Sequence, residues 1–176
     1  MADFQPAFEN SMKWEDPKGE GEVTHDPTLA NRAAVARFGI NSAANPDAAA
    51  DGFYSMPLDQ ALEYAANLYR NTYWAKVCGS QITDQGVANK FFDLAVNAGW
   101  SRATKLVQQA LNSILAGPYV VDGACGPQTV SGINSCDPAG LLREIKAQAV
   151  KFYQDLAEAH PQDQKDLEGW ETRVNA

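Results

Sequence analysis

The feature that most constrains the fold is a series of apolar stripes at helical spacing, each ended by proline or glycine. In the first stripe Phe4, Phe8 and Met12 recur every four residues, which predicts a helix from about 4 to 15. Further stripes predict helices over 58–74, from 84 to 98, from 101 to about 116, after Pro127, from 137 to 160, and around Trp170. No alternating run is long enough to build a large sheet. The sequence therefore predicts an all-α domain of about six or seven helices, with room for a small β-hairpin in its N-terminal part.

Helix-start signals support several of these boundaries. Asp84 and Ser101 stand where an N-cap is expected, and Pro127 stands where a first-turn proline begins a short helix. Asp137 followed by Pro138 is a cap and first turn for the longest helix. These signals place most helices in the C-terminal two thirds of the chain.

The segment between the first two long helices is less regular. Asn31 to Arg37 is alanine-rich and is expected to form a helical turn, and Phe38-Gly39-Ile40-Asn41 is expected to be extended or turning. Residues 42–57 are rich in Ala, Asn, Asp and Pro, which favours an irregular loop. Such a loop suits either a substrate-gripping segment or a plain connector.

Charge and hydropathy exclude several functional classes. The formal net charge of −8 argues against a general affinity for nucleic acid or for an anionic membrane. No apolar run reaches the roughly 18 residues of a membrane span, and the N-terminus lacks the basic region and apolar core of a secretory signal. We expect synthesis in the cytoplasm without membrane insertion, so that another agent must carry the protein to any external substrate.

The chain shows no pattern for a cofactor or a metal. The glycine-containing segment from Val121 to Thr129 has no phosphate-loop lysine, and no histidine stands at zinc-site spacing from a cysteine. Cys78, Cys125 and Cys136 form no C-x-x-C pair. Two alternatives remain for them: a disulfide between Cys125 and Cys136 in an oxidising compartment, or three partly buried thiols.

Glu15 is the first candidate for chemistry. It follows Met12 by three positions, so it leaves the predicted first helix beside the buried stripe and ahead of an acidic loop. Partial burial favours the protonated form of a carboxyl group, which suits a general acid in the hydrolysis of a sugar bond. The competing interpretation is a solvated glutamate at a helix end.

Several motifs in one order resemble glycoside hydrolase family 108, the lysozyme-like N-acetylmuramidases found as phage endolysins and related secreted muramidases. Glu15, the following loop and Phe38-Gly39-Ile40-Asn41 are similar to the family's glutamate, glycine-rich segment and glycine-isoleucine turn. Other similar blocks are Leu58–Trp74, Phe91–Gly99, Val121–Thr129 and Glu168–Val174, the last three in its peptidoglycan-binding region. The resemblance implies one lysozyme-like domain over 1–176, with a catalytic lobe at 1–74 and a peptidoglycan-binding half at 75–176.

The chain departs from the family pattern around its predicted active site. Asp16-Pro17 follows Glu15 where the family has two glycines, and paired glycines are absent after Asp26-Pro27. Ala36 stands where the family has threonine. The resemblance therefore carries over Glu15, whereas the partner of Glu15 has to be chosen from the acidic loop.

The resemblance implies hydrolysis of the β-1,4 bond between N-acetylmuramic acid and N-acetylglucosamine, with Glu15 protonating the leaving oxygen. Asp26 is the first choice for the second catalytic group because the loop can fold it over the cleft, and Glu22 is the second choice. For substrate contact we select Asn41, Tyr73, Trp74, Asp93 and Asn97, which offer hydrogen bonds or an aromatic face to a sugar. Asp93 and Asn97 fit an ordinary polar helix edge equally well.

The sequence is compatible with more than one function and biological setting. A non-catalytic peptidoglycan-binding module and a lytic transglycosylase compete with the muramidase. The expected setting is a phage endolysin released through a holin, acting as a monomer on peptidoglycan in the periplasm or cell wall. A bacterial effector with a cognate inhibitor protein is the other setting.

Overall fold

The fold was analysed in a computed structural model that describes residues 1–25, 34–115 and 117–176. Its α-helices are α1 (Phe4–Glu15), α2 (Pro46–Ala50), α3 (Leu58–Tyr69), α4 (Gln85–Ala98), α5 (Trp100–Ile114), α6 (Pro127–Ser135), α7 (Pro138–Ala159) and α8 (Leu167–Asn175). Short 3₁₀ turns lie at Phe53–Ser55, Gly79–Gln81 and Pro161–Asp166, and a π-helical turn at Arg70–Trp74 continues α3. The mainly α prediction is confirmed.

A small antiparallel sheet supplies the β-structure near the N-terminus. Its strands, in the order β1-β2-β3, are β1 (Thr24–His25), β2 (Val35–Arg37) and β3 (Ile40–Asn41). Thr24 pairs with Ala36, and Arg37 pairs with Ile40. The described part of the predicted helical turn at 31–37 is thus a strand, and that prediction was wrong there.

Burial of Arg37 explains why a strand replaces the helical turn. Its guanidinium donates hydrogen bonds to the carbonyl oxygens of Gly21 at 2.8 Å, Met56 at 2.7 Å and Phe53 at 3.1 Å. These partners come from segments before β1 and after β3 in the sequence, so tertiary contacts outweigh the helix propensity of the alanines. The predicted irregular loop at 42–57 was wrong in part, because α2 and the turn at Phe53–Ser55 interrupt it.

The predicted caps are largely confirmed. Side-chain oxygens of Asp84 and Asp137 accept hydrogen bonds from the backbone N–H groups of Val87 and Gly140, both at 2.8 Å. Ser101 is not a cap, because α5 begins one residue earlier, at Trp100, directly after Gly99. Each cap satisfies a backbone donor that would otherwise have no partner at the helix start.

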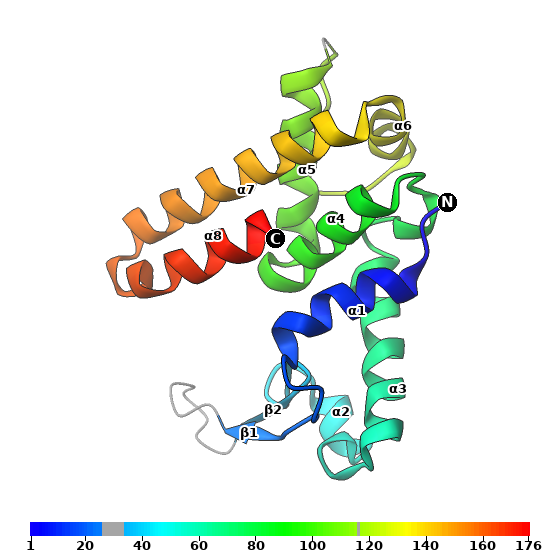
Figure 1. Ribbon diagram of the computed structural model, residues 1–176, viewed down its shortest axis with the longest axis vertical. Coiled ribbons are helices and arrows are strands. Elements are labelled where there is room, and N and C mark those ends of the chain that lie inside the picture. Colours follow the sequence, from blue (N-terminus) through cyan, green and yellow to red (C-terminus); the bar gives the residue numbers. More distant parts are fainter. Residues whose placement is uncertain (26–33, 116) are drawn as a thin grey trace.

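Helix α1 runs between two groups of elements (Figure 1). The sheet, α2 and α3 lie toward one side, and α4 to α8 lie toward the other. An aromatic centre joins α1 to both groups: the ring centroids of Phe4, Trp74 and Phe92 lie 5.8 Å apart pairwise. This packing carries the C-terminal end of α1 to a point between the sheet and α8. None of the helices in the described residues is long and apolar enough to span a membrane.

Candidate active site

The end of α1 fixes the position of Glu15. The helix closes with a hydrogen bond from the Asp16 backbone N–H to the Met12 carbonyl oxygen at 2.8 Å, and Pro17 prevents continuation. The Asp16 carboxylate then accepts from the backbone N–H groups of Gly21 at 2.9 Å and Glu20 at 3.3 Å. Asp16 therefore shapes the loop, and Glu15 is left as the side chain that points away from it.

A left-handed turn places backbone directly against the Glu15 carboxylate. Phe38 and Gly39 have φ angles of 50° and 72°, and the Tyr69 hydroxyl donates to the Phe38 carbonyl oxygen at 2.8 Å. A β-carbon on Gly39 would collide with Glu15 Oε2 and lie 2.9 Å from the Tyr69 hydroxyl oxygen. Glycine is required here for close approach as well as for backbone conformation.

Glu15 lines a cavity of about 240 Å³ beneath the sheet. The other lining residues are Asp16, Pro17, Lys18, Glu22, Thr24, Ala36, Arg37, Phe38 and Gly39. A larger cavity of about 500 Å³ borders the same loop, but it is lined mainly by apolar side chains of α1 and α3 and does not include Glu15. The larger cavity contains the carboxylates of Glu9 and Asp16, so the feature that distinguishes the smaller one is Glu15 in its lining.

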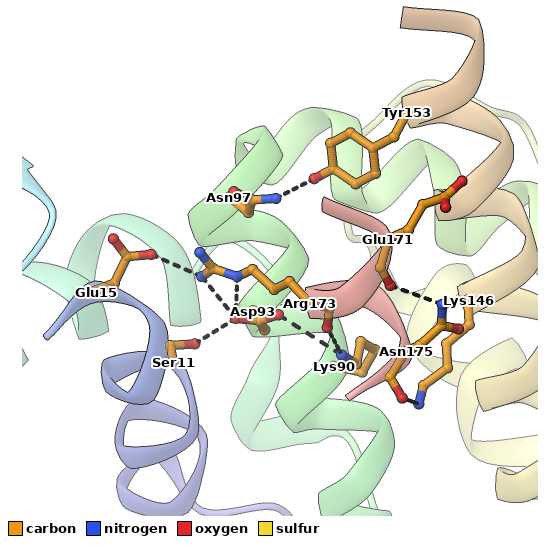
Figure 2. A network of polar contacts seen from close by, with 10 residues as sticks. All are labelled: Ser11, Glu15, Lys90, Asp93, Asn97, Lys146, Tyr153, Glu171, Arg173 and Asn175. Carbon is orange, nitrogen blue, oxygen red and sulfur yellow. Dashed lines mark hydrogen bonds and ion pairs between the residues drawn. The ribbon is translucent and has the colours of Figure 1, made fainter. Parts of the chain in front are cut away.

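Arg173 of α8 forms an ion pair with Glu15. Its Nη2 lies 2.8 Å from Glu15 Oε1 and 2.9 Å from Asp93 Oδ1, and its Nε donates to Asp93 Oδ1 at 3.1 Å. Figure 2 shows the guanidinium between the carboxylates of α1 and α4. The exposed fractions of the side chains are 18% for Glu15, 11% for Arg173 and 1% for Asp93. The pair is thus largely shielded from solvent screening.

The charges around Arg173 are balanced inside the protein. Burial alone would lower the pKa of Arg173, but hydrogen bonding and attraction to Asp93 and then to Glu15 outweigh it and raise that pKa. Lys90 lies 3.9 Å from Asp93, and burial lowers the Lys90 pKa although Asp93 opposes this. The Ser11 hydroxyl donates to Asp93 at 3.3 Å. Asp93 therefore acts as an internal counter-ion, a different position from the substrate contact predicted for it.

Two tyrosines also lie close to Glu15. Burial raises the pKa of Tyr69 well above its usual value, and the negative charge of Glu15 adds to the shift. Tyr73 shows the same two causes, and its ring lies 5.4 Å from that of Tyr69 between centroids. Tyr73, predicted for substrate contact, is thus half-buried beside Glu15. Its contact with a sugar stays a prediction.

Three other residues predicted for substrate contact make internal contacts. Trp74 is 3% exposed and donates from its indole N–H to the Ser80 hydroxyl at 2.8 Å, so the core holds it away from a ligand in this conformation. Asn97 donates to the Tyr153 hydroxyl, which joins α4 to α7. Asn41 accepts from the Ala43 backbone N–H at 2.8 Å and so caps a local turn.

The predicted partners of Glu15 have different outcomes. Glu22 lines the same cavity, where it is exposed and lies 3.6 Å from Lys18. Asp26 falls outside the residues that the structure describes. Within residues 1–25, 34–115 and 117–176 no group of three or more His, Cys, Asp or Glu side chains is arranged to hold a metal ion.

Sequence reasoning missed two side chains next to Glu15. Arg173 was not singled out from the sequence, because ordinary surface helices carry arginines at similar spacing. Trp14 is 37% exposed, and the Arg173 guanidinium carbon lies 5.9 Å from its ring centroid. Its position one residue before Glu15 was the available signal, since an exposed aromatic beside a candidate acid is a natural sugar platform.

A mainly α fold with a small sheet over a helix-end carboxylate fits the class of lysozyme-like glycoside hydrolases. Residues 16–99 match the family model described as Glycosyl hydrolase 108, and residues 102–175 match the one described as Predicted Peptidoglycan domain. The two matches together span most of the chain, and the resemblance found in the sequence is confirmed. Together they support a peptidoglycan hydrolase. The first match begins one residue after Glu15.

A solved structure of SagA from Brucella abortus is similar over nearly the whole chain. The TM-score is 0.70 at 20% sequence identity, and the alignment covers 98% of this chain and 89% of the SagA chain. At that identity the similarity establishes the fold. No curated protein sequence matches the chain.

Proposed function

We propose that this protein is a lysozyme-type N-acetylmuramidase that hydrolyses the β-1,4 bond between N-acetylmuramic acid and N-acetylglucosamine, with Glu15 as its general acid. The observation that carries the proposal is the position of Glu15. This partly exposed carboxylate lines a cavity, and its two oxygens are held by Arg173 and against Gly39. The glycosyl hydrolase 108 and peptidoglycan domains supply the substrate class.

The mechanism follows from the chemistry of glycoside hydrolysis. Glu15 protonates the leaving oxygen while positive charge develops on the sugar ring. After transfer, its carboxylate is stabilised by the Arg173 guanidinium 2.8 Å away. Glu22, which lines the cavity, and Asp26 are the candidates for the second group. A separation of about 5 Å between the two carboxyls would give a retaining reaction, and roughly 6.5–9.5 Å an inverting one.

The test compares wild-type protein with Glu15→Gln on purified peptidoglycan. The amide keeps the shape of the side chain and removes the proton donor, so we expect clearing to fall by at least about 100-fold. Chromatography of the fragments should show reducing N-acetylmuramic acid ends from the wild type. Anhydromuramic ends would identify a lytic transglycosylase instead. Undiminished clearing by the variant would rule out Glu15 as the acid.

One observation favours a non-catalytic peptidoglycan-binding module. The Glu15 carboxylate already has a buried guanidinium partner, an arrangement that also suits a purely structural glutamate. Sedimentation with purified cell walls separates the two functions. Wild-type protein that binds walls without releasing fragments would establish the module, whereas fragment release would establish the hydrolase.

For the biological setting we propose a phage endolysin that reaches peptidoglycan in the periplasm or cell wall only when the inner membrane is opened. The alternative setting, an injected effector with a cognate inhibitor, uses the same chemistry. Expression inside bacteria with and without a pore-forming holin distinguishes them. Lysis that requires the holin supports the endolysin, and lysis without it contradicts this setting.

A further inference from the structure

The C-terminal helix supplies a charged group to the centre of the candidate active site. Arg173 belongs to the segment matched by the peptidoglycan domain, whereas Glu15 ends α1 at the opposite end of the sequence. Their side chains meet at 2.8 Å, and both are mostly buried. An exposed ion pair would contribute little to stability, whereas a pair shielded from solvent fixes the relative position of its two side chains.

Arg173 is itself held in place by groups on α4. Asp93 binds the guanidinium through both Nε and Nη2, and the Lys90 ammonium donates to the Arg173 carbonyl oxygen at 2.9 Å. These contacts come from one face of a buried helix (Figure 2). The position of the guanidinium is therefore set by the protein core and not by Glu15 alone.

We propose that Arg173 is the positioning residue for Glu15, and that Asp93 neutralises Arg173 so that Glu15 can carry a proton. This inference rests on the proposed function. An unbalanced guanidinium beside Glu15 would favour its ionised form and so remove the acid. Because Asp93 shares the same guanidinium, Arg173 can bind Oε1 without imposing a full positive charge. Oε2, which faces Gly39 in the cavity wall, is the oxygen that bears the proton.

Other titratable groups also surround Glu15. Tyr69 and Tyr73 border it from α3 and the π-helical turn, and both are neutral near pH 7, since a phenol has an ordinary pKa of about 10 and burial raises it further. The remaining charged groups around the cavity are Asp16, Lys18, Glu22 and Arg37. None of these is changed in the experiment below, so shifts between variants report on Arg173 and Asp93.

The test is the pH profile of kcat/KM on peptidoglycan for Arg173→Met and Asp93→Asn. Removing the cation should move the alkaline limb to higher pH by about one unit or more and lower kcat at least about 10-fold through lost orientation. Removing the anion leaves Arg173 unbalanced and should move the same limb to lower pH. Arg143→Met, at an exposed position on α7, is the control and should change neither value.

Opposite shifts are the result that a merely structural role cannot produce. Circular dichroism reports whether each variant folds. Should Arg173→Met fail to fold, Arg173→Lys decides, because it keeps the charge and loses the two-pronged contact: kcat should fall while the limb stays in place. Shifts in the same direction, or none, overturn the inference. An inactive wild type, or an active Glu15→Gln variant, would instead overturn the proposed function.

A separate observation concerns two cysteines that meet between the two domains. Cys78 Sγ donates to the Cys125 carbonyl oxygen at 2.9 Å, and Cys125 Sγ donates to the Val77 carbonyl oxygen at 3.4 Å. Burial, and after it the neighbouring Cys78 thiol, raise the pKa of Cys125. The thiol beside Cys125 is therefore that of Cys78. All three cysteines are free and half-buried, which is the second of the two alternatives that the sequence left open.

We propose that Cys78 and Cys125 form a disulfide when the protein meets an oxidising thiol–disulfide pool. One thiolate attacks a small disulfide such as oxidised glutathione, and the second thiolate displaces the attached glutathione. Two thiols and one glutathione disulfide become one protein disulfide and two glutathione thiols. The bond would join residues 16–99 covalently to residues 102–175. Under the proposed function the protein acts outside the cytoplasm, where oxidising conditions allow disulfides to persist.

The test treats the folded full chain with oxidised glutathione and then alkylates the remaining thiols before mass spectrometry. We expect a mass loss of about 2 Da before alkylation, one alkylated cysteine at Cys136, and a melting temperature higher by about 5–10 °C. Cys136→Ser should still form the bond, whereas Cys78→Ser and Cys125→Ser should not. Three alkylated thiols in the treated wild type would overturn the proposal.

Discussion

At the residue scale, the candidate site depends on how the two oxygens of one carboxylate are used. Oε1 of Glu15 is paired with Arg173, and Oε2 lies against the turn at Gly39. Both neighbours restrict rotation of the side chain, so the carboxyl group is preorganised before any substrate binds. The adjacent Asp16 is used instead to shape the loop. Two successive acids thus have separate tasks that spacing alone does not distinguish.

Gly39→Ala tests this preorganisation. The added methyl group would displace Glu15 Oε2 at a φ angle of 72°, so we expect activity to fall at least about 10-fold and stability to fall by roughly 1–2 kcal/mol. Gly52→Ala is the matched control, because Gly52 has a φ angle of 74° and open space around it. It should lose similar stability with no loss of activity. Equal activity loss in both variants would contradict the contact with Glu15.

The sequence predicts site residues well only where position along a helix decides their environment. The position of Glu15 was predicted correctly because helical spacing from Met12 places it at the end of α1 beside the buried face. The internal contacts of Asp93 and Trp74 were not predicted, because helical spacing shows that they share a face with other residues but not which element covers that face. Helix α8 covers Asp93, and the aromatic centre around Phe4 and Phe92 covers Trp74.

At the element scale, α8 matters through its C-terminal carbonyl groups as well as through Arg173. Lys90 donates to the Arg173 carbonyl oxygen and Lys146 to the Asn175 carbonyl oxygen, both at 2.9 Å. Cations at a helix C-terminus satisfy free carbonyl groups and interact favourably with the helix dipole. Two lysines from α4 and α7 therefore dock the last turn of α8 (Figure 2).

The two lysines are predicted to differ in effect because they differ in burial. Lys90→Met removes an ammonium group from a side chain that is only 7% exposed. The Arg173 carbonyl oxygen loses its donor and Asp93 loses a neighbouring cation, so the free energy of unfolding should fall by about 1–2 kcal/mol. Activity should fall as well, because α8 carries Arg173. Lys146→Met is expected to cost less than about 1 kcal/mol. Chemical denaturation and peptidoglycan clearing measure both effects, and equal losses would contradict the docking role of Lys90.

Elements were predictable from the sequence in proportion to their length. Long helices such as α7 bury one continuous stripe, and Asp137 with Pro138 marks the start of α7 unambiguously. The strand β2 has three residues and lies in an alanine-containing segment, so neither periodicity nor propensity identifies it. Its conformation depends on pairing with β1 and β3 and on the buried Arg37, which are contacts from outside the segment.

At the scale of the whole molecule, one hydrophobic cluster extends from α1 and α3 through α4 to α7 and α8. It crosses the boundary between the two matched families, so the segments that they cover share a core. Tyr69 and Tyr153 are embedded in this cluster at 2% and 3% exposure. A change that forces either phenol to ionise therefore acts on the stability of the complete chain.

Alkaline pH supplies such a change. Burial raises the pKa values of Tyr69, Tyr73 and Tyr153 above the usual 10, and a hydrogen bond to Asp51 raises that of Tyr64 to about 12. Above pH 10 the unfolded chain loses phenolic protons that the folded chain keeps, so the free energy of unfolding falls as pH rises. The stabilising contribution is complete below pH 10 and is lost through the folded pKa values. Each such phenol contributes a slope of up to about 1.4 kcal/mol per pH unit.

The measurement is the urea midpoint at each pH. These phenols should change it little between pH 7 and 9, and it should fall steeply from about pH 10 upward. Lys90 opposes this fall up to about pH 10.5. Its pKa is lowered in the folded protein, so unfolding takes up a proton in this range and the Lys90 contribution to stability increases with pH. Tyr69→Phe is the informative variant: it loses the hydrogen bond to Phe38 but also loses one titrating phenol. Its stability should be lower than that of the wild type at pH 8, and the gap should narrow by pH 11. A gap that stays constant would show that Tyr69 ionises equally in both states and that burial in the shared core does not hold its proton.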